Sequence, residues 1–295
     1  MSIGLSLVGV KTLEELTRIA DDYPDCTFEL SYYSTHEFLK QAMPVIKGRI
    51  ASMHALTPKR EYFPNLGYEG AFEWSRREIV EDARYAFSLG AANIVLHPGY
   101  AIEALVHTDT AKRMEQVQTC GLGQYSLPGF PKICSPEYLK SRRYRKSFDI
   151  MTENAITVSE LIFQDFGVRL CLENLPPRPG YLLFTPEEML LLAERGLSLC
   201  LDIGHMQVCS AVFGFDLTRA VCNVIESGAV RTMHMHSNPS CPGRYTDSHE
   251  GPALYNRELD RIVSCAKAHD VNMISEVVDN AYESVSVLTS LYSLA

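Results

Sequence analysis

The chain has 295 residues, which suits one large domain or two small ones. Hydrophobic residues make up 46% and charged residues 21%, proportions that are typical of a globular protein and exclude bulk disorder. The formal net charge of −9 disfavours broad nonspecific binding to nucleic acid.

Short apolar runs alternate with longer helical patterns along the whole chain. One helix is expected to open at Thr12, where Glu15 would complete a capping box, and another at Thr185. A long helical pattern at 71–89 is expected to end at Gly90. The apolar runs that we predict as β-strands are, in chain order, 3–8, 26–32, 49–56, 93–97, 168–173, 197–203, 230–237 and 272–277.

Eight strands that alternate with helices predict a parallel sheet with right-handed crossovers. Closure into a (β/α)8 TIM barrel is the simplest arrangement, and such a barrel needs about 250 residues. We therefore expect one barrel domain over 1–295. The alternative is an open doubly wound sheet, but no Gly-x-Gly-x-x-Gly follows the first strand, so a dinucleotide-binding fold is not supported.

Several features bear on where the protein is found. The N-terminus lacks a basic segment followed by a long apolar run, so we expect no export signal. No stretch approaches ~18 uninterrupted apolar residues, so we expect no membrane-spanning helix. The nine cysteines form no Cys-x-x-Cys pair, which indicates reduced core thiols in a cytoplasmic protein rather than a redox pair. The sequence does not indicate an oligomeric state.

One segment breaks the alternation. About 35 residues, 100–134, lie between the fourth strand and the next helix, and loops of that length are usually functional or disordered. The segment follows His97-Pro98-Gly99 directly, so we expect it to form a lid or wall over the catalytic end of the barrel. The next helix is expected to begin at 135–137. The first turns of this helix carry a run of basic residues, which is either a solvated helix face or a binding site for an anionic substrate. The candidates for binding an anion are Arg142, Arg143 and Arg145.

The third to eighth predicted strands each end in an ionisable side chain. These side chains are His54, His97, Glu173, Asp202, His234 and Glu276. Active sites of this barrel lie at the C-terminal ends of its strands. Successive side chains of a strand point to opposite faces, and the residues two positions earlier are mostly small or weakly polar, so we expect all six side chains to point inward.

Carboxylates and imidazoles that converge inside a barrel are costly unless a cation compensates them. Imidazole with carboxylate suits Zn, Mn or Fe rather than Ca. His205, Asp247 and His249 lie in neighbouring segments and are expected to reach the same mouth. We therefore predict a centre of two or three divalent metal ions, with zinc favoured.

These motifs resemble those of the xylose-isomerase-like barrels, which include endonuclease IV, the second family of AP endonucleases. The resemblance covers the whole chain except the insertion. It rests on His97 in His-Pro-Gly, Glu173 in Leu-Glu-Asn, Asp202 and His205 as Asp-x-x-His, and Asp247 with His249 as Asp-x-His. It implies three zinc ions with these nine ligands: His54, His97, Glu173, Asp202, His205, His234, Asp247, His249 and Glu276.

The sugar isomerases and epimerases of the superfamily resemble the chain as well. They imply a single metal with Glu173, Asp202, His234 and Glu276 as ligands. His236 has the same parity as His234, so the sequence leaves open which of them is a ligand. We favour His234 and regard His236 as a candidate substrate-binding residue.

The sequence differs from endonuclease IV in two places. The first strand reads Ile-Gly-Leu-Ser instead of a Gly-Ala-His type, and the seventh reads His-Met-His-Ser instead of His-x-Asn-Asp. The insertion would also obstruct duplex DNA, so a small anionic or sugar-like substrate, or a flexible single strand, is expected.

The sequence is compatible with three enzymatic activities and with one non-enzymatic role. The first, which we favour, is hydrolysis of a phosphate ester in the manner of endonuclease IV, in which Glu173 bridges two ions and orients water. The second is isomerisation or epimerisation of a sugar or sugar phosphate, with Glu173 and Glu276 as acid and base. A multinuclear iron oxidase and a barrel retained as a binding scaffold are the other two.

Overall fold

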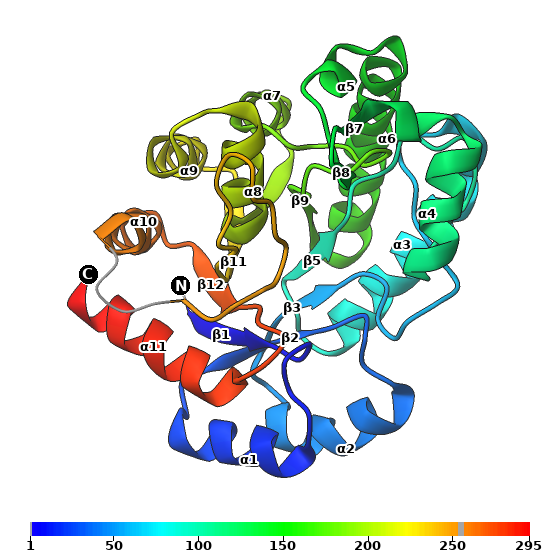
Figure 1. Cartoon of the computed structure of the whole chain (residues 1–295). Helices are drawn as coiled ribbons and strands as arrows, with labels where there is room; N and C mark the ends of the chain where they lie inside the picture. The colour runs from blue at the N-terminus through cyan, green and yellow to red at the C-terminus, as the bar shows by residue number, and fades with distance from the viewer. Residues whose placement is uncertain (1, 253–256) are drawn as a thin grey trace.

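The computed structural model describes residues 2–252 and 257–295. Eight strands close into a barrel in the order β1-β12-β11-β10-β9-β5-β3-β2, and neighbouring strands are parallel (Figure 1). Their bounds are β1 Ile3–Ser6, β2 Thr27–Leu30, β3 Ile50–His54, β5 Asn93–Leu96, β9 Arg169–Glu173, β10 Ser198–Asp202, β11 Val230–Met235 and β12 Asn272–Ser275. The predicted (β/α)8 barrel is confirmed, and each strand falls within its predicted run.

Helices surround the barrel as an outer ring (Figure 1). They are α1 Leu13–Asp22, α2 His36–Ile46, α3 Phe72–Ser88, α6 Arg142–Phe166, α7 Pro186–Glu194, α8 Ile203–Phe213, α9 Leu217–Glu226, α10 Arg257–Ala268 and α11 Ala281–Leu294. Thr185 and Glu188 form a complete capping box. The box predicted at Thr12 is only half formed: its side chain caps the Glu15 amide, but the Glu15 carboxylate accepts from the Lys11 amide instead of the Thr12 amide.

The barrel interior and the helix-facing side carry different residues, as strand parity predicts. Val95, Cys171 and Cys200 form a separate buried cluster inside the barrel. Met53, Leu96 and Leu172 belong instead to the large core that also contains the helices' apolar faces. Each residue of this cluster lies two positions before an ionisable residue at the end of its strand and points to the same side. The cluster therefore forms the floor of the site.

The predicted insertion is folded and packs on the barrel. It contains β6 (Val106–His107), which pairs with β4 (Tyr62–Phe63), then α4 (Thr110–Thr119), the 3-10 turn η2 (Leu122–Tyr125) and the hairpin of β7 (Ser126–Leu127) and β8 (Phe130–Cys134). Tyr100 forms a bridge with Tyr181 of the loop after β9. Buried side chains such as Ile102, Val106 and Leu122 join the main core.

The helix expected to begin at 135–137 is broken. A short helix, α5 (Glu137–Lys140), is followed by extended backbone at Ser141, and α6 starts at Arg142. The Ser141 side chain accepts from the Tyr144 amide, so it caps the long helix and separates it from α5.

No helix within the described ranges 2–252 and 257–295 is long and apolar enough to cross a membrane.

Candidate metal centre

The strand ends bring six ionisable side chains into the barrel mouth. His54, Glu173 and Asp202 are the last residues of β3, β9 and β10, and His234 lies near the end of β11. His97 and Glu276 each follow the final residue of their strand. Five of the six side chains are less than 9% exposed, so their charges face one another rather than solvent.

The first group of potential ligands is His54, His97 and Glu173, whose donor atoms lie within 4.8 Å of one another. Glu173 Oε2 is 3.0 Å from His54 Nε2 and 3.4 Å from His97 Nε2. His54 Nδ1 donates to the Ala55 carbonyl at 2.9 Å. When the ring is neutral, this bond places the proton on Nδ1 and leaves a lone pair on Nε2, the nitrogen that faces Glu173.

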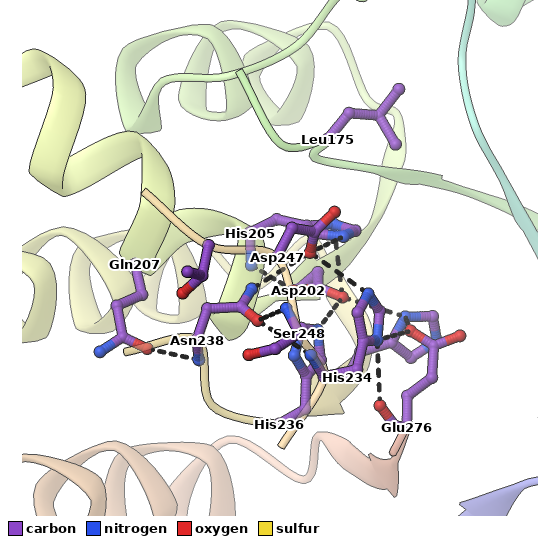
Figure 2. A network of polar contacts seen from close by, with 12 residues as sticks. Leu175, Asp202, His205, Gln207, His234, His236, Asn238, Asp247, Ser248 and Glu276 are labelled. Carbon is purple, nitrogen blue, oxygen red and sulfur yellow. Dashed lines mark hydrogen bonds and ion pairs between the residues drawn. The ribbon is translucent and has the colours of Figure 1, made fainter. Parts of the chain in front are cut away.

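The second group is Glu173, Asp202, His234 and Glu276, again with donor atoms within 4.8 Å of one another. His234 Nδ1 is 3.5 Å from Glu173, 3.6 Å from Asp202 and 3.2 Å from Glu276. Figure 2 shows His234 between Asp202 and Glu276. Glu29, from the middle of β2, approaches the other ring nitrogen, with Oε1 at 3.0 Å from Nε2. His234 is therefore surrounded by four carboxylates.

The third group is His205, His236 and His249. His205 Nδ1 donates to the Asn174 carbonyl and His249 Nδ1 to the Glu276 carbonyl, so both rings repeat the arrangement of His54. Their Nε2 atoms lie 3.6 and 3.4 Å from Oδ1 of Asp247. His236 stacks on His249 with ring centroids 3.8 Å apart.

The structure separates the two histidines that the sequence left ambiguous. His234 contacts the carboxylates of the second group, whereas His236 belongs to the third and places Nε2 2.9 Å from Asp202. Asp247 lies beside the third group, but Arg178 and Asn238 also hold its carboxylate, at 2.6 and 3.2 Å. Its role as a ligand stays a prediction.

Burial and charge act in opposite directions on these groups. Burial by itself raises the pKa of Glu173, but the imidazoles of His97 and His234 outweigh it and hold that pKa well below its usual value. Burial by itself lowers the pKa of His234, but the surrounding negative charges, Glu276 and Glu29 among them, raise it well above the usual value. The site therefore favours a positive charge at its centre.

The residues fit divalent ions. Both ring nitrogens of His234 are buried, and neither has a hydrogen bond of regular geometry within the described part of the chain. The first two groups overlap at Glu173, which is a member of both. A mixed imidazole and carboxylate set suits Zn, Mn or Fe. Histidines that donate their second nitrogen to a carbonyl are oriented in the way that metal sites require.

The predicted arginines lie elsewhere. Arg143 donates to the carbonyls of Ala101 and Cys120. Arg142 lines two hollows apart from the candidate centre, and Arg145 lines one of them. None of them lines the cavity of about 270 Å³ that opens onto the candidate ligands. That cavity is bordered instead by two other arginines, Arg113 and Arg178.

Several residues that shape the site were not singled out from the sequence. Glu29 is a single carboxylate in the buried run Phe-Glu-Leu. The alternation of side chains along this strand, which points Glu29 into the barrel, is the sequence signal that could have identified it. Asn174 accepts from the Asp202 amide and donates to its carbonyl, which ties β9 to β10. Asn238 accepts from the amides of Ser248 and His249 and so holds the loop that carries Asp247 (Figure 2).

Comparisons with known proteins agree on the fold. No family model matches the chain. An uncharacterised protein of Methanocaldococcus jannaschii, MJ1311, is 22% identical over 216 residues, which is 65% of this chain and 71% of that protein.

Two solved structures are informative. A D-tagatose 3-epimerase-like protein has a TM-score of 0.66 and 19% identity, with 100% of this chain and 98% of that chain covered. Endonuclease IV of Thermus thermophilus has a TM-score of 0.57 and 19% identity, with 99% and 98% covered. The predicted resemblance to the xylose-isomerase-like barrels is thus confirmed as a likeness of fold.

Proposed function

We propose that the chain is a metal-dependent enzyme that hydrolyses a phosphate ester, with two or three divalent ions at the mouth of the barrel. The observation that carries the proposal is the presence of three ligand groups, two of which share Glu173. A mononuclear site would need only one of these groups. Zinc is the favoured metal, and manganese and iron are alternatives.

Ions of this kind, when bound, lower the pKa of a water molecule and stabilise developing charge on phosphoryl oxygens. The chain's own residues would provide the rest. His54, His205 and His249 are each fixed by a backbone carbonyl, so their Nε2 atoms need little reorganisation. Glu173 contacts a histidine in each of the two groups that share it, which supports a role in orienting the attacking water.

The size of the cavity favours a small substrate. A volume of about 270 Å³ suits a small molecule or one flipped-out nucleotide better than a duplex. Part of the cavity wall comes from the insertion, through Tyr100, Thr110 and Arg113. This supports the proposal of a small or single-stranded substrate.

The test is a hydrolysis panel with zinc-loaded protein. It contains p-nitrophenyl phosphate, bis(p-nitrophenyl) phosphate, and abasic oligonucleotides in single-stranded and duplex form. We expect turnover of a small ester or the single strand, and loss of that turnover in Glu173→Gln. Absence of hydrolysis on the whole panel by fully loaded protein counts against a phosphoesterase, and preferential cleavage of the duplex counts against a small substrate.

A second candidate is a sugar isomerase or epimerase. Glu173, Asp202, His234 and Glu276 form a complete four-ligand set by themselves, and the fold is like that of a D-tagatose 3-epimerase-like protein. Glu173 and Glu276 would then exchange protons with carbon atoms of the substrate. Incorporation of solvent deuterium beside a carbonyl, measured over a panel of ketoses and their phosphates, distinguishes this reaction from hydrolysis.

A further inference from the structure

The cavity beside the candidate metal centre has a positively charged wall. Arg113 of α4 is only 8% exposed and lines this cavity. Its hydrogen bonds go to neutral oxygens: the Tyr181 hydroxyl, the carbonyls of His107 and Thr108, and the Thr110 hydroxyl. Among residues 2–252 and 257–295, no carboxylate forms an ion pair with Arg113. A buried guanidinium without a counter-charge is costly, so an anion in the cavity would stabilise it.

Arg178 provides a second cation on the same wall. It follows β9 and lines the cavity together with Arg113. The two guanidinium carbons lie 5.9 and 5.8 Å from the ring centroid of Tyr181, which both cations contact. Arg178 donates to Asp247 through Nη2 alone. Asp247 thus pairs with Arg178 and not with Arg113, so the two cations share the wall with a single paired carboxylate and the charge of Arg113 stays uncompensated among the described residues.

Tyr100 adds an unused hydroxyl. Its side chain is fully buried and lines the same cavity, and its hydroxyl has no hydrogen-bond partner in the described part of the chain. The ring lies 5.1 Å from that of Tyr181, centroid to centroid. A buried hydroxyl without a partner, in the wall of a cavity that two cations also line, is an open hydrogen-bonding position for a ligand oxygen.

Arg49 shows that backbone contacts alone do not make such a site. It also donates to three carbonyls, those of Cys26, Ala20 and Tyr23. Its side chain is more exposed than that of Arg113 and lies away from the candidate centre. Arg113 differs because it combines burial with a place in the wall of the cavity.

We propose that Arg113, Arg178 and the Tyr100 hydroxyl form a subsite for a phosphate group of the substrate, separate from the group that reacts at the metal centre. The subsite deepens the proposed function, since it rests on the cavity being a substrate pocket, but it fits either reaction class. The substrate is then a small phosphorylated molecule with a second reactive part, either a further phosphate ester or a sugar hydroxyl and carbonyl. Paired guanidinium groups favour phosphate because they donate in a bidentate geometry.

The test is calorimetric binding to zinc-loaded protein, with inorganic phosphate and phosphonoacetate as probes. Phosphonoacetate carries two anionic groups, so one is available to the metals and the other to the subsite. We expect it to bind more tightly than phosphate to the unchanged protein. Arg113→Gln and Arg178→Gln should each weaken phosphonoacetate binding about 10-fold or more. Arg178→Lys should weaken it less, because the charge and the pairing with Asp247 are retained.

Arg142→Gln is the matched control, since Arg142 lies outside this cavity, and its affinities should not change. Zinc content and the circular dichroism spectrum of each variant show whether the centre and the fold are intact. If Arg113→Gln does not fold, the Arg178 pair of variants decides the question. Equal affinities in all zinc-loaded variants would overturn the subsite. If those variants also hydrolyse phosphate esters at the rate of the unchanged protein, the proposed function is retained and only the subsite is refuted. If phosphonoacetate binding depends on the arginines but no ester is hydrolysed, the subsite is retained and the hydrolytic function is refuted.

Discussion

Glu29 and His234 meet inside the barrel, where Oε1 of the carboxylate lies 3.0 Å from Nε2 of the imidazole. Both side chains are fully buried. Ser52 donates to the other carboxylate oxygen at 2.7 Å and so fixes Glu29 from β3. The contact orients the ring so that Nδ1 faces Glu173, Asp202 and Glu276. A carboxylate behind a metal-binding histidine raises its basicity and holds its orientation.

Glu29→Gln is therefore expected to weaken zinc binding about 10- to 100-fold, although Glu29 is not in any ligand group. Competition with a chromogenic zinc chelator measures this change. Ser52→Ala, which leaves the carboxylate in place, should produce a smaller effect. Unchanged affinity in Glu29→Gln would show that Glu29 does not support the centre.

The number of ions follows from the overlap of the ligand groups. We expect at least two metal ions per chain, measured by elemental analysis of protein purified without chelators. His97→Ala should lower the content by one ion, because His97 belongs only to the first group. Glu173→Gln should lower it by more, because Glu173 is shared. One ion or none in the well-folded, unchanged protein contradicts a multinuclear centre.

Zinc binding at pH 7 should release protons. In the metal-free chain burial opposes protonation of His249, but Asp247 and Glu276 outweigh it and raise its pKa to about 10. The pKa of His234 is also raised. Both rings are thus protonated below their folded pKa values and must lose the proton to bind a metal, so affinity rises with pH through the neutral range. Titration calorimetry in two buffers of different ionisation enthalpy counts the protons, and a count of zero would refute this protonation state.

Asn65 is expected to be required for stability. It is fully buried and uses both ends of its amide, since it donates to the carbonyls of Ile102 and Ala104 and accepts from the amides of Gly67 and Tyr100. Asn65→Ala leaves these groups without partners and should lower the free energy of unfolding by on the order of 3 kcal/mol. Urea denaturation measures the loss. Gln41→Ala, on the exposed face of α2, should change stability little.

Much of the fold could be predicted because its signals are local. Each strand is a short apolar run, and the alternation of its side chains says which residues point inward. His54, Glu173 and Asp202 end β3, β9 and β10 as expected, and the separate cluster of Val95, Cys171 and Cys200 lies inside the barrel. The break at Ser141 was missed, because a polar residue between two helical patterns can continue a helix or cap the next one.

By itself, the sequence determined the eight strands, their inward faces and the residue types gathered at the mouth. It did not determine which side chains meet across the barrel, because parity gives a direction but not an opposing partner. Closure of the sheet and its register placed Glu29 behind His234 and separated His236 from it. The packing of the insertion likewise placed Arg113 beside Arg178 at one tyrosine ring. These pairings join residues that are distant along the chain, and no local period encodes them.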